Sequence, residues 1–503
     1  EMSASLVGSE MCIRDSKRYG PKGVTTFMTF SSVSFLCLFL PAVFGLYHIL
    51  PGARAKNALL IAASLLFYAW GEPVYILLMI LSVLVNWLAG RWIGSARKGA
   101  RLPMVLAVVF NLALLGVFKY SGFLMETLGA VTGLALPVPR ISLPIGISFF
   151  TFQAMSYVLD VYWNPGQMQK SFWKLLLYIS FFPQLIAGPI VRYHDIEGQL
   201  SSRTVTVDET AAGLRRFLAG LAKKMLLANA MAVAADGIFG MDLSILSAPA
   251  AWIGAIAYLF QIYFDFSGYS DMAIGLSRMF GFTFPENFRY PYAALGIKDF
   301  WRRWHISLSG WFRDYLYIPL GGNRKGKVRT WLNQLIVFFC TGLWHGANVT
   351  FIVWGLFHGA LLIAESSGLL NVRKWRFKGL AHMYTLLMVT VGFVIFRADT
   401  MGDAWLYLKA MFTSWSVGGV TLRQAVGYLT PYFLLLTAAA ALACTPVWPR
   451  LQEAARRRAE TGGGDGLARA VRAGSYALSG AALLLCLFAL ATDSYNPFIY
   501  FRF

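Results

Sequence analysis

Two near-identical pentapeptides, GLWHG at residues 342–346 and GLFHG at residues 355–359, each place one histidine between two glycines in an apolar segment. A polar side chain at membrane depth is costly, which makes His345 and His358 candidates for proton transfer. Glycines four residues apart also let helices approach closely, so packing alone accounts for the glycines. At about 100° per residue, the two histidines would lie on different faces of a continuous helix. We therefore expect only one of them in a reactive site, and the spacing does not choose which.

A second concentration of reactive side chains is KDFWRRWHISLSGWFRDYLYIPLGGNRKGK, residues 298–327, which contains His305. Its arginines and tryptophans could grip a phosphorylated, ring-bearing ligand. The Gly-Gly-Asn turn before Arg324 and Lys325 could turn backbone amides toward a phosphate. The alternative is an interfacial helix anchored by tryptophan, followed by a basic cytoplasmic loop. Residue types alone leave both interpretations open.

Two carboxylates and a proline-interrupted segment complete the polar features of the apolar spans. Asp265 and Asp271 could relay protons, pack helices or pair with arginines. Six residues apart, they do not share a helix face well, which argues against an acid/base pair. The prolines at 183 and 189 predict a broken or re-entrant helix lining a cavity within residues 181–195.

Composition indicates what must position these residues. Of 503 residues, 57% are hydrophobic and only 14% charged, and the mean hydropathy is +0.57. These values are typical of a polytopic membrane protein. The net charge of +20 comes from short basic clusters between apolar spans. Such clusters are typical of loops at an anionic cytoplasmic leaflet, so we expect membrane lipid as a partner and no nucleic acid.

The apolar pattern predicts an all-α bundle of about 10–12 transmembrane helices, with re-entrant and interfacial helices around a central cavity. Residues 208–229 have the helical alternation of an amphipathic interfacial helix, and a solvated connecting helix is the alternative. The cysteines and histidines lack metal-ligand spacing, so no metal is expected. Residues 1–27 have no apolar core of signal-peptide length, and we interpret them as a non-native or disordered leader before a single domain at 28–503.

The long ordered motifs FWRRWHISLSGWFRDYLYIPLGGNR, TGLWHGANVTFIVWGLFHG and YNPFIYFRF resemble the membrane-bound O-acyltransferase family. The resemblance covers essentially residues 28–503. It is strongest to the bacterial branch that contains the membrane subunit of alginate O-acetylation and the D-alanyl transferase of teichoic acids. The Trp-His-Ile-Ser stretch and IPLGGNR favour the polysaccharide-acetylating members.

The resemblance implies transfer of an acyl group, expected to be acetyl, from a cytoplasmic thioester donor to a hydroxyl reached from the far side of the membrane. The family's invariant histidine corresponds to His345 and its second polar position to His305, whereas His358 would pack. A neutral imidazole can take the hydroxyl proton, and His305 could donate to the oxyanion or position the acceptor. The charged residues expected to hold the donor are Arg302, Arg303, Arg324 and Lys325.

The resemblance also implies a cellular setting. The donor would be acetyl-CoA or a carrier-bound acyl thioester, with no permanently bound cofactor. The chain would lie in the bacterial inner membrane, with a periplasmic SGNH-hydrolase-like acetylase and polysaccharide export machinery as partners. A D-alanyl-type transferase of the same family, or a proton-coupled transporter that uses histidine and aspartate, remain the alternatives. Their tests are a D-alanine carrier as donor, or transport without acyl transfer.

Overall fold

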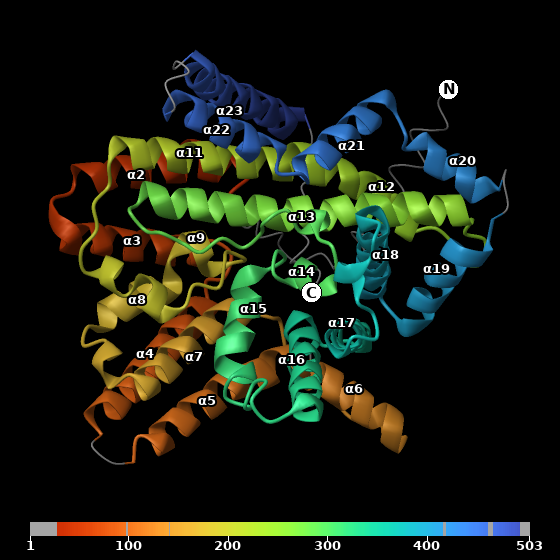
Figure 1. Ribbon diagram of the computed structural model, residues 1–503. Coiled ribbons are helices and arrows are strands. Elements are labelled where there is room, and N and C mark those ends of the chain that lie inside the picture. Colours follow the sequence, from red (N-terminus) through yellow and green to blue (C-terminus); the bar gives the residue numbers. More distant parts are fainter. Residues whose placement is uncertain (1–27, 97–98, 140, 416–418, 461–465, 493–503) are drawn as a thin grey trace.

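The computed structural model describes residues 28–96, 99–139, 141–415, 419–460 and 466–492, and all regular structure in these ranges is helical (Figure 1). An all-α polytopic fold is therefore confirmed. The interpreted leader, most of the TGGGDG loop and the terminal YNPFIYFRF motif lie outside the described residues.

The first half of the chain forms twelve α-helices: α2 (Leu40–Ile49), α3 (Gly52–Ala69), α4 (Tyr75–Ser95), α5 (Arg101–Leu115), α6 (Ser121–Thr132), α7 (Ile147–Trp163), α8 (Phe172–Ser180), α9 (Phe182–Leu185), α10 (Tyr193–Ile196), α11 (Val207–Ala222), α12 (Asn229–Phe239) and α13 (Ala248–Met279). The second half forms ten more: α14 (Ile297–Trp301), α15 (Ile306–Phe312), α16 (Lys327–His345), α17 (Val349–Ser367), α18 (Lys378–Arg397), α19 (Met401–Thr413), α20 (Val420–Gly427), α21 (Pro431–Ala443), α22 (Val447–Glu460) and α23 (Gly466–Thr492).

Shorter turns connect or interrupt these helices. The wide π-helical turns are η1 (Phe35–Phe39), η2 (Gly116–Tyr120), η5 (Lys223–Ala228) and η7 (Arg313–Tyr317). The tight 3₁₀ turns are η3 (Pro165–Gln167), η4 (Gly198–Leu200), η6 (Pro291–Ala293) and η8 (Val372–Lys374).

Within the described ranges, six helical runs are long and apolar enough to cross a membrane, or seven if the bent pair α20–α21 is one span. The runs are residues 75–95, 101–132, 207–239, 349–367, 378–397 and 466–492. Several segments counted from the sequence are shorter or more polar. The amphipathic segment at 208–229 is helical, but it continues through η5 into α12 as one 33-residue run.

The long helix α13 is the axis of the fold, and Figure 1 shows it beside the α11–α12 run across the whole molecule. Glycines make this approach possible. A Cβ on Gly220 of α11 would lie 2.5 Å from the Gly268 carbonyl oxygen of α13, and one on Gly213 would lie 2.7 Å from that of Gly275. No side chain larger than hydrogen fits between the two backbones.

Both membrane aspartates of α13 pair with cations of the α11–η5 segment. Asp265 and Lys224 form an ion pair with an N–O distance of 2.6 Å, and both side chains are buried. Asp271 accepts from Lys223 at 2.6 Å and from Arg216 at 2.7 Å. Of the three roles considered for these carboxylates, the structure supports pairing with basic side chains, because partnered charges are the ones that low-dielectric interiors tolerate.

The proline-interrupted segment is a broken helix, as predicted, and the basic-aromatic segment is also broken into short helices. Residues 172–196 form α8, α9 and α10, with the buried extended stretch around Pro189 between α9 and α10. Residues 297–317 form α14, α15 and η7. Trp301, Trp304 and Trp311 are at most 8% exposed. The interpretation of this segment as an interfacial helix anchored by tryptophan is therefore wrong, because its tryptophans pack in the interior.

Candidate active site

The two glycine-histidine motifs form the contact between α16 and α17. A Cβ on Gly355 would overlap the Phe338 carbonyl oxygen and lie 3.2 Å from the Gly342 nitrogen. The close helix pair predicted from the glycine spacing is therefore confirmed. The chain is not one continuous helix, however. It breaks at Gly346, which is extended, and Asn348 caps the start of α17 by accepting from the Thr350 nitrogen. The angular argument based on a continuous helix therefore does not apply.

His345 is the last residue of α16 and lies in a pocket of aromatic rings. Its ring centroid is 5.1 Å from those of Trp354 and Phe396, in both cases edge to face, and 6.4 Å from that of His305. Its Nδ1 atom is buried and has no hydrogen-bond partner. The residue is 8% exposed, against 1% for both His305 and His358. Of these three histidines, His345 is the one that a substrate reaches with the least rearrangement.

His305 begins α15 in the left-handed conformation, with φ of 45°. Its Nδ1 lies 3.1 Å from Oδ1 of Asn287, and the same oxygen accepts from the hydroxyl of Ser307 at 2.9 Å. The Asn287 amide nitrogen donates to Ser270 Oγ at 2.9 Å. Because Asn287 Oδ1 is an acceptor, the His305 proton sits on Nδ1 and its buried, unpartnered Nε2 carries the lone pair. This nitrogen can accept a hydrogen bond but, in the neutral ring, cannot donate one.

His358 lies on α17 and does not contact His345. Trp354 stands between them, with centroids 5.1 Å from His345 and 5.3 Å from His358. The Trp301 indole donates to His358 Nδ1 at 3.4 Å. The tertiary structure thus pairs His345 with His305, from the basic-aromatic segment, and places His358 against the tryptophans behind them.

Trp354 is a further candidate site residue that was not recognised from the sequence. Trp354 Nε1 is a buried donor without a partner, and its ring edge packs against His345. An indole N–H can only donate, so an unpaired one beside the histidine is a suitable partner for a negatively charged oxygen. Its position one residue before the second pentapeptide gave no signal that it would contact the first histidine.

The end of α16 is held by the α5–α6 region. Lys119 Nζ donates to the carbonyl oxygens of Trp344 at 2.5 Å and His345 at 3.2 Å. The hydroxyl of the adjacent Tyr120 donates to the Leu343 carbonyl at 2.6 Å. The last carbonyls of a helix have no partners within it, and here two side chains from the π-helical turn η2 supply them. Three consecutive carbonyls ending at His345 are therefore fixed from outside the helix.

The four basic residues expected to hold the donor do not converge. Arg302 lines a groove of about 230 Å³ between α14–α15 and α16–α17, which also contains Thr341, one turn before His345. Arg303, just beyond the end of α14, pairs with Asp299 of that helix at 3.1 Å. The Lys325 side chain packs over Gly321. Arg324 lines a different cavity, of about 560 Å³. Of the four, only Arg302 lies on a path toward His345.

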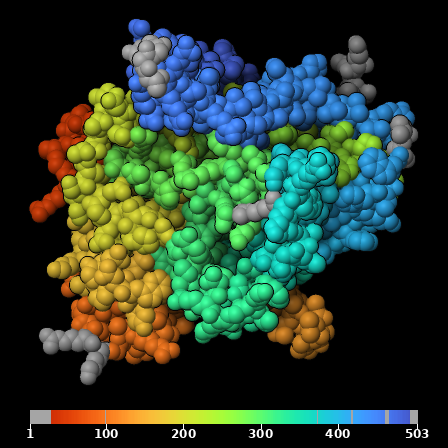
Figure 2. Space-filling model, viewed as in Figure 1, coloured from red at the N-terminus to blue at the C-terminus, as the bar shows by residue number. Residues whose placement is uncertain are grey.

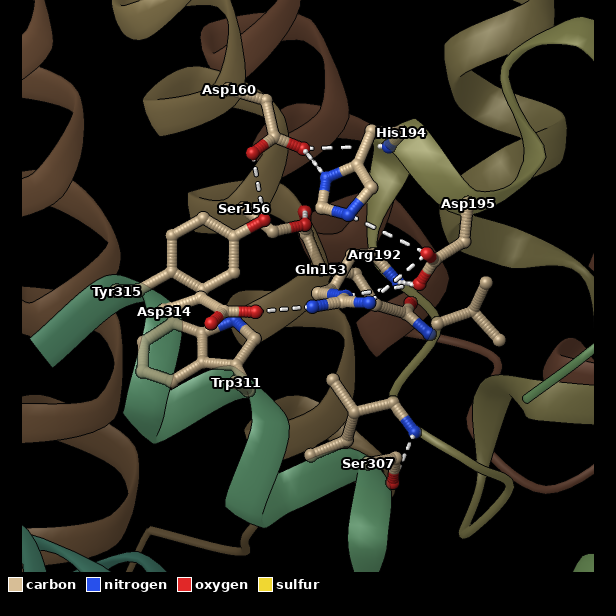
Figure 3. A network of polar contacts seen from close by, with 12 residues as sticks. Gln153, Ser156, Asp160, Arg192, His194, Asp195, Ser307, Trp311, Asp314 and Tyr315 are labelled. Carbon is tan, nitrogen blue, oxygen red and sulfur yellow. Dashed lines mark hydrogen bonds and ion pairs between the residues drawn. The ribbon is translucent and has the colours of Figure 1, made fainter. Parts of the chain in front are cut away.

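The cavity that contains Arg324 borders the polar network in Figure 3. Asp160, 6% exposed, accepts from the Tyr315 hydroxyl at 2.7 Å and contacts His194 Nδ1 at 2.9 Å. Arg192 joins Asp195, at 3.0 Å, to Asp314 on η7. The network ties the broken segment after α9 to α7 and to the helix that follows His305, and so supports the site from one side.

Figure 2 shows that segments from the middle of the chain, in green and cyan, form the centre of this face of the molecule. The residues that surround His345 and His305 come from η2, α13, α15–α18 and the loop before α14, although the first and the last of them, Lys119 and Phe396, are 277 positions apart in the chain. In the described residues, no group of three or more histidine, cysteine or acidic side chains has the geometry to hold a metal ion.

Residues 166–399 match the sequence model of MBOAT, the membrane-bound O-acyltransferase family. The chain is 40% identical over 499 residues to a probable alginate O-acetylase AlgI of Pseudomonas putida, covering 95% of this chain and all of that protein. It is 38% identical over 422 residues to a peptidoglycan O-acetyltransferase of Helicobacter pylori, covering 76% and 80%. It is 30% identical over 216 residues to a teichoic acid D-alanyltransferase of Bacillus subtilis, covering 40% and 53%.

Proposed function

The chain belongs to the membrane-bound O-acyltransferase family and is an O-acyltransferase of multiple membrane spans, and we propose that it passes an acetyl group from a cytoplasmic thioester donor across the membrane for O-acetylation of an exported polysaccharide such as alginate. The observation that supports this assignment best is the pair His345 and His305. Their ring centroids are 6.4 Å apart, and each ring has a buried nitrogen without a partner. Buried polar atoms are normally paired, so the two unpaired nitrogens of neighbouring rings support the proposal that substrate hydroxyls bind beside them.

His345 is the general base of the proposed reaction. It takes the proton of the acceptor hydroxyl as the oxygen attacks the thioester carbonyl. The carbon–sulfur bond then breaks, and His345 returns the proton to the departing thiolate. The Trp354 indole N–H donates to the oxyanion that forms in between. His305, whose Nε2 accepts only, binds a hydroxyl of the acceptor and orients it. The sequence also allowed His305 to donate a hydrogen bond to the oxyanion. That role would require a proton on Nε2, which the contact with Asn287 places on Nδ1.

The donor enters by the groove beside α16. Lys298, Arg302 and Arg313 provide positive charge there, and apolar walls lead to Thr341. Thr341 and His345 are four residues apart on α16, about 6 Å along the axis. A narrow thioester arm fits a groove of about 230 Å³, with its phosphates left at the basic residues. Acetyl-CoA and a carrier-bound acyl group share this arm, and both meet these requirements.

The acceptor comes from the opposite side of the membrane, in the cytoplasmic membrane of a bacterium. A periplasmic acetylase of the SGNH-hydrolase type then passes the acetyl group to the polymer, next to the export machinery. The full-length similarity to an alginate O-acetylase supports acetyl over D-alanyl transfer, because similarity to the D-alanyltransferase covers only 53% of that protein.

The test is acetyl transfer by the purified protein from labelled acetyl-CoA, in membranes that contain the acceptor system. We expect His345→Ala to lose about 10²–10⁴-fold in rate, as for removal of a positioned base. His48→Ala is the matched control, because His48 is an exposed histidine on α2. Full activity of a folded His345→Ala protein would refute the assignment of the base. Acyl transfer only from a D-alanyl carrier, or transport without acyl transfer, would replace the proposed function with one of its alternatives.

A further inference from the structure

A cavity of about 990 Å³ lies between the α11–α13 pair and the C-terminal helices α21–α23, away from the donor groove. Figure 1 shows α22 and α23 lying along the outer side of α11. The cavity is rich in charge. Its lining includes five cationic and two acidic side chains: Arg215, Arg216, Lys223, Arg278 and Arg289, with Asp271 and Glu286.

The two carboxylates are fully engaged by two of the cations. Arg216 donates to Glu286 at 2.6 and 3.1 Å and to Asp271 at 2.7 Å. Lys223 donates to the other oxygen of Asp271 at 2.6 Å. Arg278 pairs with Glu209, outside the cavity, at 3.0 Å. These pairs are structural, and they leave the charge of the remaining lining residues uncompensated.

Arg215 and Arg289 provide that excess. Neither has a carboxylate within ion-pair distance among the described residues. The Arg215 guanidinium lies 4.8 Å from the ring centre of Tyr476 on α23, and its Nη1 is a buried donor with no hydrogen-bond partner. A buried guanidinium N–H without an acceptor costs free energy, so an anion bound at this position would be stabilising.

The wall formed by the C-terminal helices is partly apolar, and Gln452 of α22 and Ser475 and Ser479 of α23 also line it. Leu436 and Ala439 come from α21, and Leu478 and Ala482 from α23. The apolar window of α23 is only 6% buried within the protein, so most of this helix faces lipid. Trp448 at the start of α22 also lines the cavity, in the way that tryptophans mark a membrane interface. An occupant can therefore enter sideways from the membrane.

We propose that this cavity binds the phosphate of an anionic glycerophospholipid between Arg215 and Arg289, with an acyl chain against α21 and α23. Basic pockets between transmembrane helices suit such head groups, and the arginine fork matches phosphate oxygens. The volume is at the upper end for small-ligand sites and has room for a head group with part of a chain. The apolar half of the wall favours a lipid over a water-soluble nucleotide.

The chain segment 286–290 connects this cavity to His305. Glu286, Phe288, Arg289 and Tyr290 line the cavity, and Asn287 between them holds His305. The Arg289 nitrogen donates to the Arg303 carbonyl at 2.9 Å, and the Ile306 nitrogen to the Asn287 carbonyl at 2.9 Å. Tyr290, like His305, is a non-glycine residue with positive φ. A lipid bound to Arg289 therefore steadies the same short segment that fixes the His305 ring.

The test is competition between lipids, measured without turnover, so that its outcome is independent of the acyl-transfer assignment. Delipidated protein is incubated with equal amounts of phosphatidylglycerol and phosphatidylcholine, and bound lipids are counted by native mass spectrometry. We expect the wild type to prefer phosphatidylglycerol, and the Arg215→Gln/Arg289→Gln variant to lose about ten-fold of that preference. Arg101→Gln/Arg329→Gln removes the same charge at exposed residues outside the cavity and should retain the preference.

Ala482→Trp keeps every charge but fills the apolar wall, and it should reduce phosphatidylglycerol binding if the chain lies there. This variant decides the matter if the double arginine variant does not fold. An unchanged lipid ratio in the folded arginine variant, or unchanged phosphatidylglycerol binding in folded Ala482→Trp, would overturn the proposal. Displacement of phosphatidylglycerol by coenzyme A at similar concentrations would also overturn it, because the phosphate would then belong to a soluble donor.

Discussion

Lys119→Met removes the external cap of the helix that ends at His345. The lysine ammonium donates to the carbonyls of Trp344 and His345, at 2.5 and 3.2 Å, and to Ser148 Oγ at 3.3 Å. Methionine preserves most of the apolar stem and deletes the three donors. Hydrogen bonds to charged groups contribute about 1.5–3 kcal/mol each, and the carbonyls left behind have no partner within α16. We expect the free energy of unfolding to fall by about 2–3 kcal/mol.

The effect on catalysis should exceed the effect on stability, because the freed end of α16 carries His345, the proposed base. A displacement of about 1 Å at a reacting group can cost roughly 10²-fold in rate. We therefore predict that kcat for acetyl transfer falls by about 10²-fold, while KM for acetyl-CoA changes by less than about two-fold. The groove proposed for the donor is lined by residues that Lys119 does not contact. The assay is initial rate against acetyl-CoA concentration, with thermal unfolding measured in parallel.

Two matched variants separate positioning from general destabilisation. Lys119→Arg keeps a cation that can reach the same carbonyls and should recover much of kcat. Tyr120→Phe deletes only the neutral hydrogen bond to the Leu343 carbonyl, two residues before His345, and should cost about 1 kcal/mol of stability with a smaller loss of kcat. If Lys119→Met loses stability but keeps kcat, or if KM rises in place of kcat, the positioning argument is wrong.

Two further predictions concern packing and pH. Gly355→Ala should lower the free energy of unfolding, measured by urea titration, by about 1–3 kcal/mol, because its Cβ would overlap the Phe338 carbonyl. Gly474→Ala is the control: this glycine lies in open space on α23, and its replacement should be neutral or slightly stabilising. An equally stable Gly355→Ala protein would contradict the close contact. The hydrogen bond with Asp160 raises the pKa of His194 above its ordinary 6.5, so His194 stabilises the fold fully below pH 6.5 and loses this contribution as the pH rises through the raised pKa. The difference in melting temperature between wild type and His194→Gln should therefore be larger at pH 6 than at pH 8.5, and a constant difference would count against the pair.

Much of the architecture followed from local pattern. The apolar composition required helices, since a membrane-embedded backbone must satisfy its own hydrogen bonds. The prolines at 183 and 189 indicated the break between α8 and α10, and the glycine spacing indicated the close contact of α16 with α17. These are properties of a few neighbouring residues, so the sequence carries them directly. From the sequence, the tryptophans of 298–327 fitted either a ligand-gripping segment or a membrane interface, because an amphipathic ring suits more than one environment.

The site was harder to predict, because its parts come from distant segments. His345 and His305 could be named from a family resemblance, but nothing in their spacing indicated that the rings meet. The four basic residues of 302–325 looked like one cluster, yet turns at His305, Gly321 and Gly322 direct them to different places. Lys119 and Trp354 carried no signal, since a lysine after an apolar run and a tryptophan in a membrane helix are ordinary.

The sequence by itself determined an all-helical membrane protein with tight glycine contacts, basic loops and a short set of histidines that could act as a base. Those properties depend on residue type and on neighbours within one or two helical turns. Only the tertiary structure decided which histidines share a pocket, which carbonyls Lys119 caps, and where charge is left unpaired beside α23. These depend on how α5, α7, α15 and α16 cross, and crossing is set by contacts between side chains hundreds of positions apart. The glycines specify which helices approach closely, and the packing of the interior specifies which side chains meet in the site.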